Sequence, residues 1–282
     1  DPNTGLVPED ARDELRQAGS YWQRYLESVD EPSGDTAQYA FRIYGPEGLG
    51  RPKDAQRAAE VMARESNDVA TYLVLVQTAA QAGDTILLST GTYTMSASGL
   101  KFATDVTVAS ANADKPAVIT SLSITNSAGL TIRDLDLNAL AAGGGNPFKI
   151  YRSQDIHLDR LNVHGSLDGN PQNDVKGLLI RESKNVSVTG SEFQDLADGI
   201  AHIDSQGVTI ARNEFHHLTY DAVRGGGSSD VTITANVFRD FFPKAGDHPD
   251  VIQFWPTNTK ASARDIVITD NAFIRGDGAA VQ

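Results

Sequence analysis

"GVTIARNEF" (207–215) and "DVTITANVF" (230–238) are two copies of one nine-residue motif that recurs along the chain. Apolar residues stand at the second, fourth and ninth positions of each copy, as Val208, Ile210 and Phe215 do in the first. This alternation is typical of a short strand that buries one face, followed by a bend after which the inward pattern resumes. Four more copies align with these two without gaps: "GLTIRDLDL" (129–137), "DIHLDRLNV" (155–163), "NVSVTGSEF" (185–193) and "DIVITDNAF" (265–273).

The spacing of the six copies predicts a solenoid. Successive copies begin 22 to 35 residues apart, and a period near 22 with loop insertions is expected when each repeat forms one coil and stacks strand on strand. The seventh position is asparagine in three successive copies, at Asn213, Asn236 and Asn271. A preference of asparagine for turns does not explain the same register three times. We therefore predict a ladder of stacked amides at one bend of the solenoid.

The stretch "ATYLVLVQTAAQAGDTILLSTGTYT" (70–94) predicts a helix that ends near Gly83, then a strand and a Gly-Thr-Tyr turn. Together with the six repeats, it resembles the first coil of right-handed parallel β-helix proteins of the pectate-lyase-like superfamily. The resemblance covers about residues 70–282. It implies an all-β fold, a right-handed parallel β-helix with an α-helical N-terminal cap region. It also implies a carbohydrate-active protein that is secreted or lies at the cell surface.

The N-terminal part of the chain has a different pattern. Residues 9–66 have helical spacing, so we expect a helical region over 1–69 and the β-helix over 70–282. The stretch "YGPEGLGRPKDAQRAAEVM" (44–62) is similar to Sel1-type helical repeats, and the alternative is a helical cap on the first coil. At the other end, "AAVQ" begins another coil, so we expect the solenoid to continue beyond Gln282 or a partner to cover this end.

Composition excludes several classes of function. The net charge of −13, with no run of Lys or Arg, argues against nucleic acid and anionic membranes as partners. The absence of cysteine removes disulfides and thiol chemistry. No apolar run approaches the roughly 18 residues that a membrane span needs. An acidic polymer remains a candidate substrate if a local basic cluster or a bridging cation receives it.

A second set of strands lies between the motif copies, and it brings three aspartates into one column. Asp198, Asp221 and Asp250 each stand two residues before the inward-facing residue of such a strand. Stacked strands lie about 4.8 Å apart, so these carboxylates would repel and raise one another's pKa. A shared proton, a bridging cation or nearby basic residues would offset the repulsion, whereas the alternative is three ordinary turn aspartates. The inward residues that set this alignment are Leu178, Ile200, Val223, Ile252 and Val281.

Basic, aromatic and amide side chains gather on the same predicted sheet edge, which also receives the two longest insertions, 164–174 and 239–250. We expect a substrate groove there. The candidate catalytic residues are Lys176, Arg181, His202, Tyr220, Arg224 and His248. The candidate substrate-binding residues are Gln253 and Trp255, and the candidate calcium ligands are Asp198, Asp221 and Asp250.

These residue types suit the elimination of a uronate, which needs a cation at the carboxylate, a base and an acid. The predicted function is therefore a secreted lyase that cleaves an acidic, uronate-containing polysaccharide by β-elimination, with calcium as its candidate cofactor. In this prediction His248 transfers a proton and Asp250 orients it or holds a cation. A glycoside hydrolase with paired aspartates is the alternative enzyme, although the galacturonan hydrolase pattern "NTD", "DD", "GHG" and "RIK" is absent. A glycan-binding adhesin or tailspike domain is the alternative without catalysis.

Overall fold

The computed structural model describes residues 9–45, 48–49, 51–65, 83–141, 145–170, 173–246 and 248–276. Contacts divide the chain into two units, Asp1–Asp84 and Thr85–Gln282. The predicted helix over residues 70–82 lies outside the described residues, as do Asp247 and Val281.

Unit 1 contains three described helices, α1 (Glu9–Ser28), α2 (Gly34–Tyr44) and α3 (Pro52–Glu65). A small core of their own side chains holds them together, with Trp22 and Tyr44 as its largest members. The Tyr44 hydroxyl donates to the carbonyl of Gly19 at 2.7 Å, which ties α2 to α1. None of the described helices combines the length and the apolar character that a bilayer crossing requires. The similarity of this region to Sel1-type repeats and its role as a cap stay predictions.

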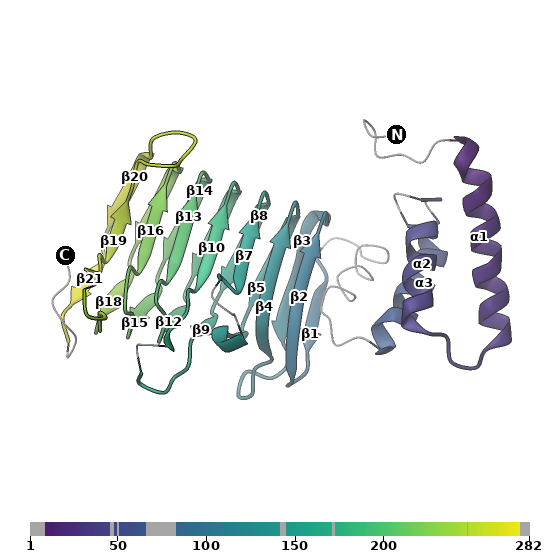
Figure 1. Ribbon diagram of the computed structural model, residues 1–282, viewed down its shortest axis with the longest axis horizontal. Coiled ribbons are helices and arrows are strands. Elements are labelled where there is room, and N and C mark those ends of the chain that lie inside the picture. Colours follow the sequence, from purple (N-terminus) through teal and green to yellow (C-terminus); the bar gives the residue numbers. More distant parts are fainter. Residues whose placement is uncertain are drawn as a thin grey trace. The chain divides into compact units, whose positions relative to one another are not determined.

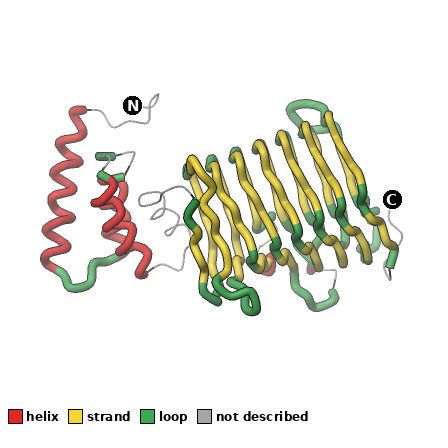
Figure 2. The backbone as a smooth tube through the Cα atoms, turned by 180° about the vertical axis from the view of Figure 1, so that it is seen from behind, coloured by secondary structure: helices red, strands yellow, loops and turns green. Residues whose placement is uncertain are grey.

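Unit 2 is a parallel β-helix, which confirms the predicted fold (Figures 1 and 2). Every strand pair in it is parallel, and each strand pairs with its counterpart one coil further along. The first sheet contains, in spatial order, β1 (Thr85–Leu88), β3 (Lys101–Ser110), β5 (Ala128–Arg133), β8 (Gln154–Asp159), β11 (Lys184–Thr189), β14 (Gln206–Ala211), β17 (Ser229–Thr234) and β20 (Arg264–Thr269).

The second sheet contains the remaining strands, which form two runs on either side of the long loops. One run is β6 (Asp136–Asn138), β9 (Asn162–His164), β12 (Glu192–Gln194), β15 (Glu214–His216), β18 (Val237–Arg239) and β21 (Ala272–Ile274). The other run is β2 (Thr92–Ser98), β4 (Val118–Thr125), β7 (Phe148–Tyr151), β10 (Leu178–Arg181), β13 (Ile200–Ile203), β16 (Val223–Gly226) and β19 (Ile252–Phe254). A short 3-10 helix, Ala139–Ala141, follows β6.

The motif register is the register of the coils. Val208 pairs with Val186 on one side and Val231 on the other, and all three side chains are fully buried. The ninth motif position forms a stack of phenylalanine rings with centroids 4.9 to 5.3 Å apart, of which the first three are buried and the last, in the final described coil, is exposed. Offset stacking of this kind adds to the free energy gained by burying the rings. The stacked rings are Phe193, Phe215, Phe238 and Phe273.

The predicted asparagine ladder is present at the bend between the two sheets. The backbone N–H of Asn213 donates to Asn236 Oδ1 at 2.9 Å, and that of Asn236 donates to Asn271 Oδ1 at 2.9 Å. Each amide nitrogen also donates to a backbone carbonyl, for example Asn236 Nδ2 to Ile210 O at 2.9 Å. The ladder therefore satisfies buried backbone groups that the bend would otherwise leave without partners.

A second ladder, of serines, lies at another bend and was not predicted from the repeat pattern. In it, each backbone N–H donates to the hydroxyl of the serine in the next coil, at 3.1 to 3.2 Å. Its members are Ser127, Ser153, Ser183, Ser205 and Ser228.

We predict that Asn236→Ala lowers the free energy of unfolding by about 3 kcal/mol, because it leaves the buried Asn213 N–H and Ile210 carbonyl without partners. Urea denaturation measures the loss. The matched control is Gln206→Ala, which removes an exposed side-chain amide whose hydrogen-bond partner among the described residues is Asp230. Equal losses in the two variants would contradict a structural role for the ladder.

Candidate functional site

Four strands, β10, β13, β16 and β19, place the predicted aspartates in one column. Leu178 pairs with Ile200, Ile200 with Val223, and Val223 with Ile252. The alignment made from the sequence is therefore the register of the sheet. Because Asp198, Asp221 and Asp250 each precede these residues by two, they occupy equivalent positions in three successive coils.

The three carboxylates lie in different surroundings. Asp221 is completely buried, and its Oδ1 accepts the backbone N–H of Asp250 at 3.0 Å. Burial raises the pKa of Asp221 from 3.8 to about 6, aided by the charges of Asp198 and Asp250 and opposed by the N–H of Asp250 and by Arg224. Asp198 is also buried, with 4% exposure. Asp250 is partly exposed and accepts a hydrogen bond from Gln253 Nε2 at 2.6 Å.

Arg224 is the centre of this site. Its Nη1 donates to Asp198 Oδ1 at 3.2 Å and lies 3.5 Å from Asp221 Oδ2, so the guanidinium sits against two buried carboxylates. Its Cζ lies 5.4 Å from the ring centroid of Tyr220 and 5.0 Å from that of Trp255. Cation–π contacts at these distances restrict the guanidinium further.

The Arg224 side chain keeps donors for a ligand. It is 25% exposed, and its Nε and Nη2 form no hydrogen bond to any part of the chain that the structure describes. An arginine whose Nη1 is held by carboxylates and whose Nε and Nη2 keep their donors available is suited to bind a carboxylate through two parallel hydrogen bonds. We call Tyr220, Arg224, His248, Gln253 and Trp255, with the aspartates beneath them, the Arg224 site.

His248 belongs to this neighbourhood. It is exposed, and its ring centroid lies 6.5 Å from that of Tyr220. The neighbouring Pro249 is buried, which anchors the loop beside the site. The predicted pairing of His248 with Asp250 is not among the hydrogen bonds of the described residues, in which Gln253 is the side chain that binds Asp250.

Lys176, Arg181 and His202 are not among the contacts that Arg224 makes in the described structure. Lys176 is exposed and stands at the position equivalent to Asp198 one coil earlier, and Arg181 is exposed, with its Nε 3.7 Å from Glu182 Oε1. His202 is completely buried, because it follows the outward-facing Ala201 and so points into the solenoid. Its Nδ1 lies 3.1 Å from Ser228 Oγ, and burial lowers the pKa of His202 to about 4. This buried position does not suit the predicted role of His202 in proton transfer at the groove.

Calcium binding at the aspartate column stays a prediction. In the described part of the chain, no three His, Cys, Asp or Glu side chains come together in a group that could hold a metal ion. Arg224 already supplies positive charge to Asp198 and Asp221. We therefore base no chemical step on calcium.

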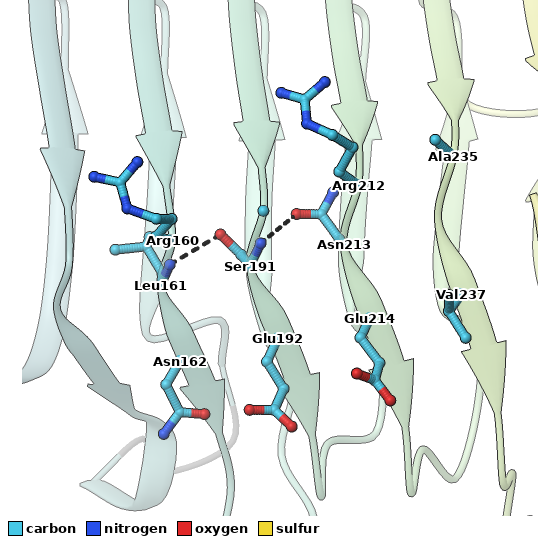
Figure 3. A pocket seen from close by; sticks show the side chains of 11 residues that line it. Arg160, Leu161, Asn162, Ser191, Glu192, Arg212, Asn213, Glu214, Ala235 and Val237 are labelled. Atoms are coloured by element: carbon cyan, nitrogen blue, oxygen red, sulfur yellow. Dashed lines mark hydrogen bonds between the residues drawn. The ribbon is translucent and has the colours of Figure 1, made fainter.

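A second concave region lies at the asparagine-ladder bend, where no site was predicted. It is a pocket of about 590 Å³ between the first sheet and strands β9, β12, β15 and β18. Figure 3 shows Arg160 and Arg212 at one end of this pocket, and Asn162, Glu192 and Glu214 at the other. The arginines occupy the sixth motif position and the polar residues the eighth. The sequence could therefore have indicated this pocket only through the polar positions of the repeat.

A smaller pocket of about 120 Å³ lies among the long loops, with Asp174, Asp195, His217 and Phe242 in its lining. Burial raises the pKa of Asp174 to about 6, aided by the charges of Asp195 and Asp168 and opposed by Lys244. Phe242 stacks on His217 there, with centroids 5.3 Å apart.

Comparison with known proteins supports the fold. The family described as "Right handed beta helix region" matches residues 176–242. No curated protein matches the chain.

Solved structures with a similar fold include three that have low sequence identity. An alginate lyase from Paenibacillus sp. str. FPU-7 is 15% identical, with 76% of this chain and 97% of that chain covered and a TM-score of 0.43. An endo-xylogalacturonan hydrolase from Aspergillus tubingensis is 13% identical, with 78% and 82% covered and a TM-score of 0.43. A putative glycosyl hydrolase from Parabacteroides merdae is 12% identical, with 78% and 89% covered and a TM-score of 0.40. At such identities the likeness concerns the fold alone.

Proposed function

We propose that unit 2 is a polysaccharide-active enzyme that cleaves a uronate-containing glycan by β-elimination at the Arg224 site. The observation that carries this proposal is the guanidinium of Arg224, which is anchored on Asp198 and Asp221 and retains unpaired donors in the described structure. A net charge of −13 would repel an acidic polymer, so a fixed local cation is what such a substrate needs. Because a polymer does not enter cells readily, we also propose that the enzyme works outside the cell or at its surface.

The elimination follows from what each group offers. Arg224 pairs with the C-6 carboxylate of the uronate, and the neutralised carboxylate makes the C-5 proton more acidic. A base removes that proton, the C-4–O bond breaks as the C-4=C-5 double bond forms, and an acid protonates the leaving oxygen. Tyr220 lies against Arg224 and the exposed His248 lies beside Tyr220, and we assign the two proton transfers to these side chains.

The remaining members of the site hold the sugar. The half-buried indole of Trp255 offers a flat apolar face on which a pyranose ring can stack. Gln253, which is held by Asp250, stands next to Arg224 in the sheet and provides amide groups for hydroxyls. Asp198 and Asp221 act through Arg224, since their burial keeps them from the substrate.

Hydrolysis is a second candidate, and the unlike surroundings of Asp198 and Asp221 favour it. Asp221 has a pKa of about 6 and is suited to act as an acid, whereas Asp198 accepts a hydrogen bond from Arg224. Direct attack on a glycosidic bond would require the covering side chains to move, because both carboxylates are buried. We therefore place hydrolysis second.

The test is incubation of the full chain with alginate, polygalacturonate and xylan. Elimination creates an unsaturated uronate that absorbs in the ultraviolet together with a new reducing end, whereas hydrolysis creates the reducing end alone. We expect both signals on an acidic polymer. Reducing ends alone would favour the aspartate pair, and binding with neither signal would favour a glycan-binding domain.

We predict that Arg224→Lys lowers kcat/KM on the acidic polymer roughly 100-fold or more, because an ammonium cannot reproduce the two-pronged contact with a carboxylate. The matched control is Arg264→Lys, which changes an exposed arginine that pairs with Asp265 on β20. An unchanged kcat/KM in Arg224→Lys would remove this residue from substrate binding.

His248→Ala should lower kcat by roughly 10²–10⁴-fold if the imidazole transfers a proton. The melting temperature should stay unchanged, because the side chain is exposed. Turnover at the wild-type rate would leave proton transfer to Tyr220, and Tyr220→Phe then tests that assignment.

Asp221→Asn should change how stability depends on pH. The folded-state pKa of Asp221 is raised from 3.8 to about 6, so the wild type loses stability as the pH rises through this window. The stability of the variant relative to wild type should therefore increase between about pH 4 and pH 6, by as much as about 3 kcal/mol, and then stay constant. Denaturant unfolding at a series of pH values measures this, with Asp265→Asn as the exposed control. A constant difference across the series would contradict the raised pKa.

A further inference from the structure

The pocket at the asparagine-ladder bend has the size and the lining of a binding site. Its volume of about 590 Å³ falls within the range of ligand-binding pockets, about 300–1,000 Å³. It lies along the corner between the first sheet and strands β9, β12, β15 and β18, and it shares no residue with the Arg224 site. We call this pocket the corner groove.

One side of the corner groove carries two arginines in unlike states. Arg160 is neutralised, since its Nε donates to Asp134 Oδ1 at 2.7 Å and its Nη2 to Asp134 Oδ2 at 3.0 Å. Arg212 is exposed, and its guanidinium forms no hydrogen bond or ion pair with any described residue. The reason is its neighbours in the column, which are Gly190 and Ala235 and cannot contribute a charge. The same two small residues leave open the space on either side of Arg212.

The other side of the groove carries two carboxylates, each of which is held by a side chain of the next coil. Glu192 and Glu214 are paired residues of β12 and β15, and they are 44% and 42% exposed. His216 Nε2 lies 2.8 Å from Glu192 Oε1, and Arg239 Nε donates to Glu214 Oε1 at 2.6 Å. The Oε2 atoms of both glutamates accept no hydrogen bond from the described residues. Each carboxylate is thus held in place through one oxygen, and its other oxygen can accept a hydrogen bond from a ligand.

This combination suits a chain of sugars. Hydroxyl groups donate to carboxylate oxygens, and a guanidinium donates to a hydroxyl or to a uronate carboxylate. The donor and acceptor positions repeat at the coil spacing of about 4.8 Å, which is comparable with the length of one pyranose residue in an extended glycan. Apart from Val237 at one end, the outward-facing lining is polar or small, so it provides no large apolar cavity for the side chain of a protein partner.

We propose that the corner groove binds a stretch of polysaccharide, separately from the Arg224 site, with Arg212, Glu192 and Glu214 as its contact residues. The inference deepens the proposed function, since it rests on the same polymer reaching both sites. A long chain held at two places on one solenoid dissociates more slowly than a chain held at one.

Affinity electrophoresis through gels that contain alginate, polygalacturonate or xylan tests this proposal with the full chain. Arg212→Gln should raise the apparent Kd for the bound polymer by about 10-fold or more, which corresponds to one lost charge-assisted contact. Its melting temperature should match wild type, because the guanidinium stabilises nothing in the described structure. Arg264→Gln removes an exposed charge of the same kind elsewhere on the solenoid and should leave the mobility shift unchanged.

The double variant Glu192→Gln/Glu214→Gln provides a second measurement on the opposite side of the groove, with a melting curve to report on the lost contacts to His216 and Arg239. If this variant and Arg212→Gln both show the wild-type mobility shift, the proposal that the corner groove binds polysaccharide is wrong. The outcome is distinct from that of the proposed function. Weakened binding in Arg212→Gln together with normal cleavage in Arg224→Lys would support the groove and contradict the elimination at Arg224.

Discussion

Parallel pairing at one constant register joins successive coils and determines which side chains can stand next to one another. It places every residue directly above the equivalent residue of the previous coil, about 4.8 Å away. Inside the solenoid this favours like residues, as the stacked rings of Phe193, Phe215 and Phe238 demonstrate. At the bends it favours side chains that can both donate and accept, and for that reason asparagines and serines form the two ladders.

The same constraint also stacks carboxylates in columns, and basic side chains lie against carboxylates of both candidate sites. Arg224 stands over Asp198 and Asp221, two carboxylates that would otherwise face each other in a buried column. In the corner groove, His216 and Arg239 take the same part for Glu192 and Glu214. The two candidate sites are therefore built alike: residues from one coil fix the groups of its neighbour, which keeps them in position for a ligand.

The fold could be predicted because its signal is periodic and apolar. The register of Val208, Val231 and Phe215, and the asparagine ladder, were readable from six aligned copies. The aspartate column followed from the same alignment, but the placement of side chains around it did not. His202 was assigned to the groove because its distance along the chain fitted, although strand alternation turns it inward. The corner groove was missed because outward positions such as Arg212 and Glu192 follow no apolar rule.

The left-handed bend at the sixth motif position restricts which substitutions can stabilise this protein without loss of a groove residue. Its backbone is left-handed in every copy, with φ of 56° at Arg212 and 58° at Gly190. For a residue other than glycine this conformation costs about 1 to 2 kcal/mol, so glycine at position 212 would make the solenoid more stable. The chain instead carries there the one guanidinium of the corner groove that its described neighbours leave unpaired. Folding stability and the proposed binding of glycan thus favour different residues at position 212. Selection for thermal stability alone would favour glycine there and remove the arginine from the corner groove.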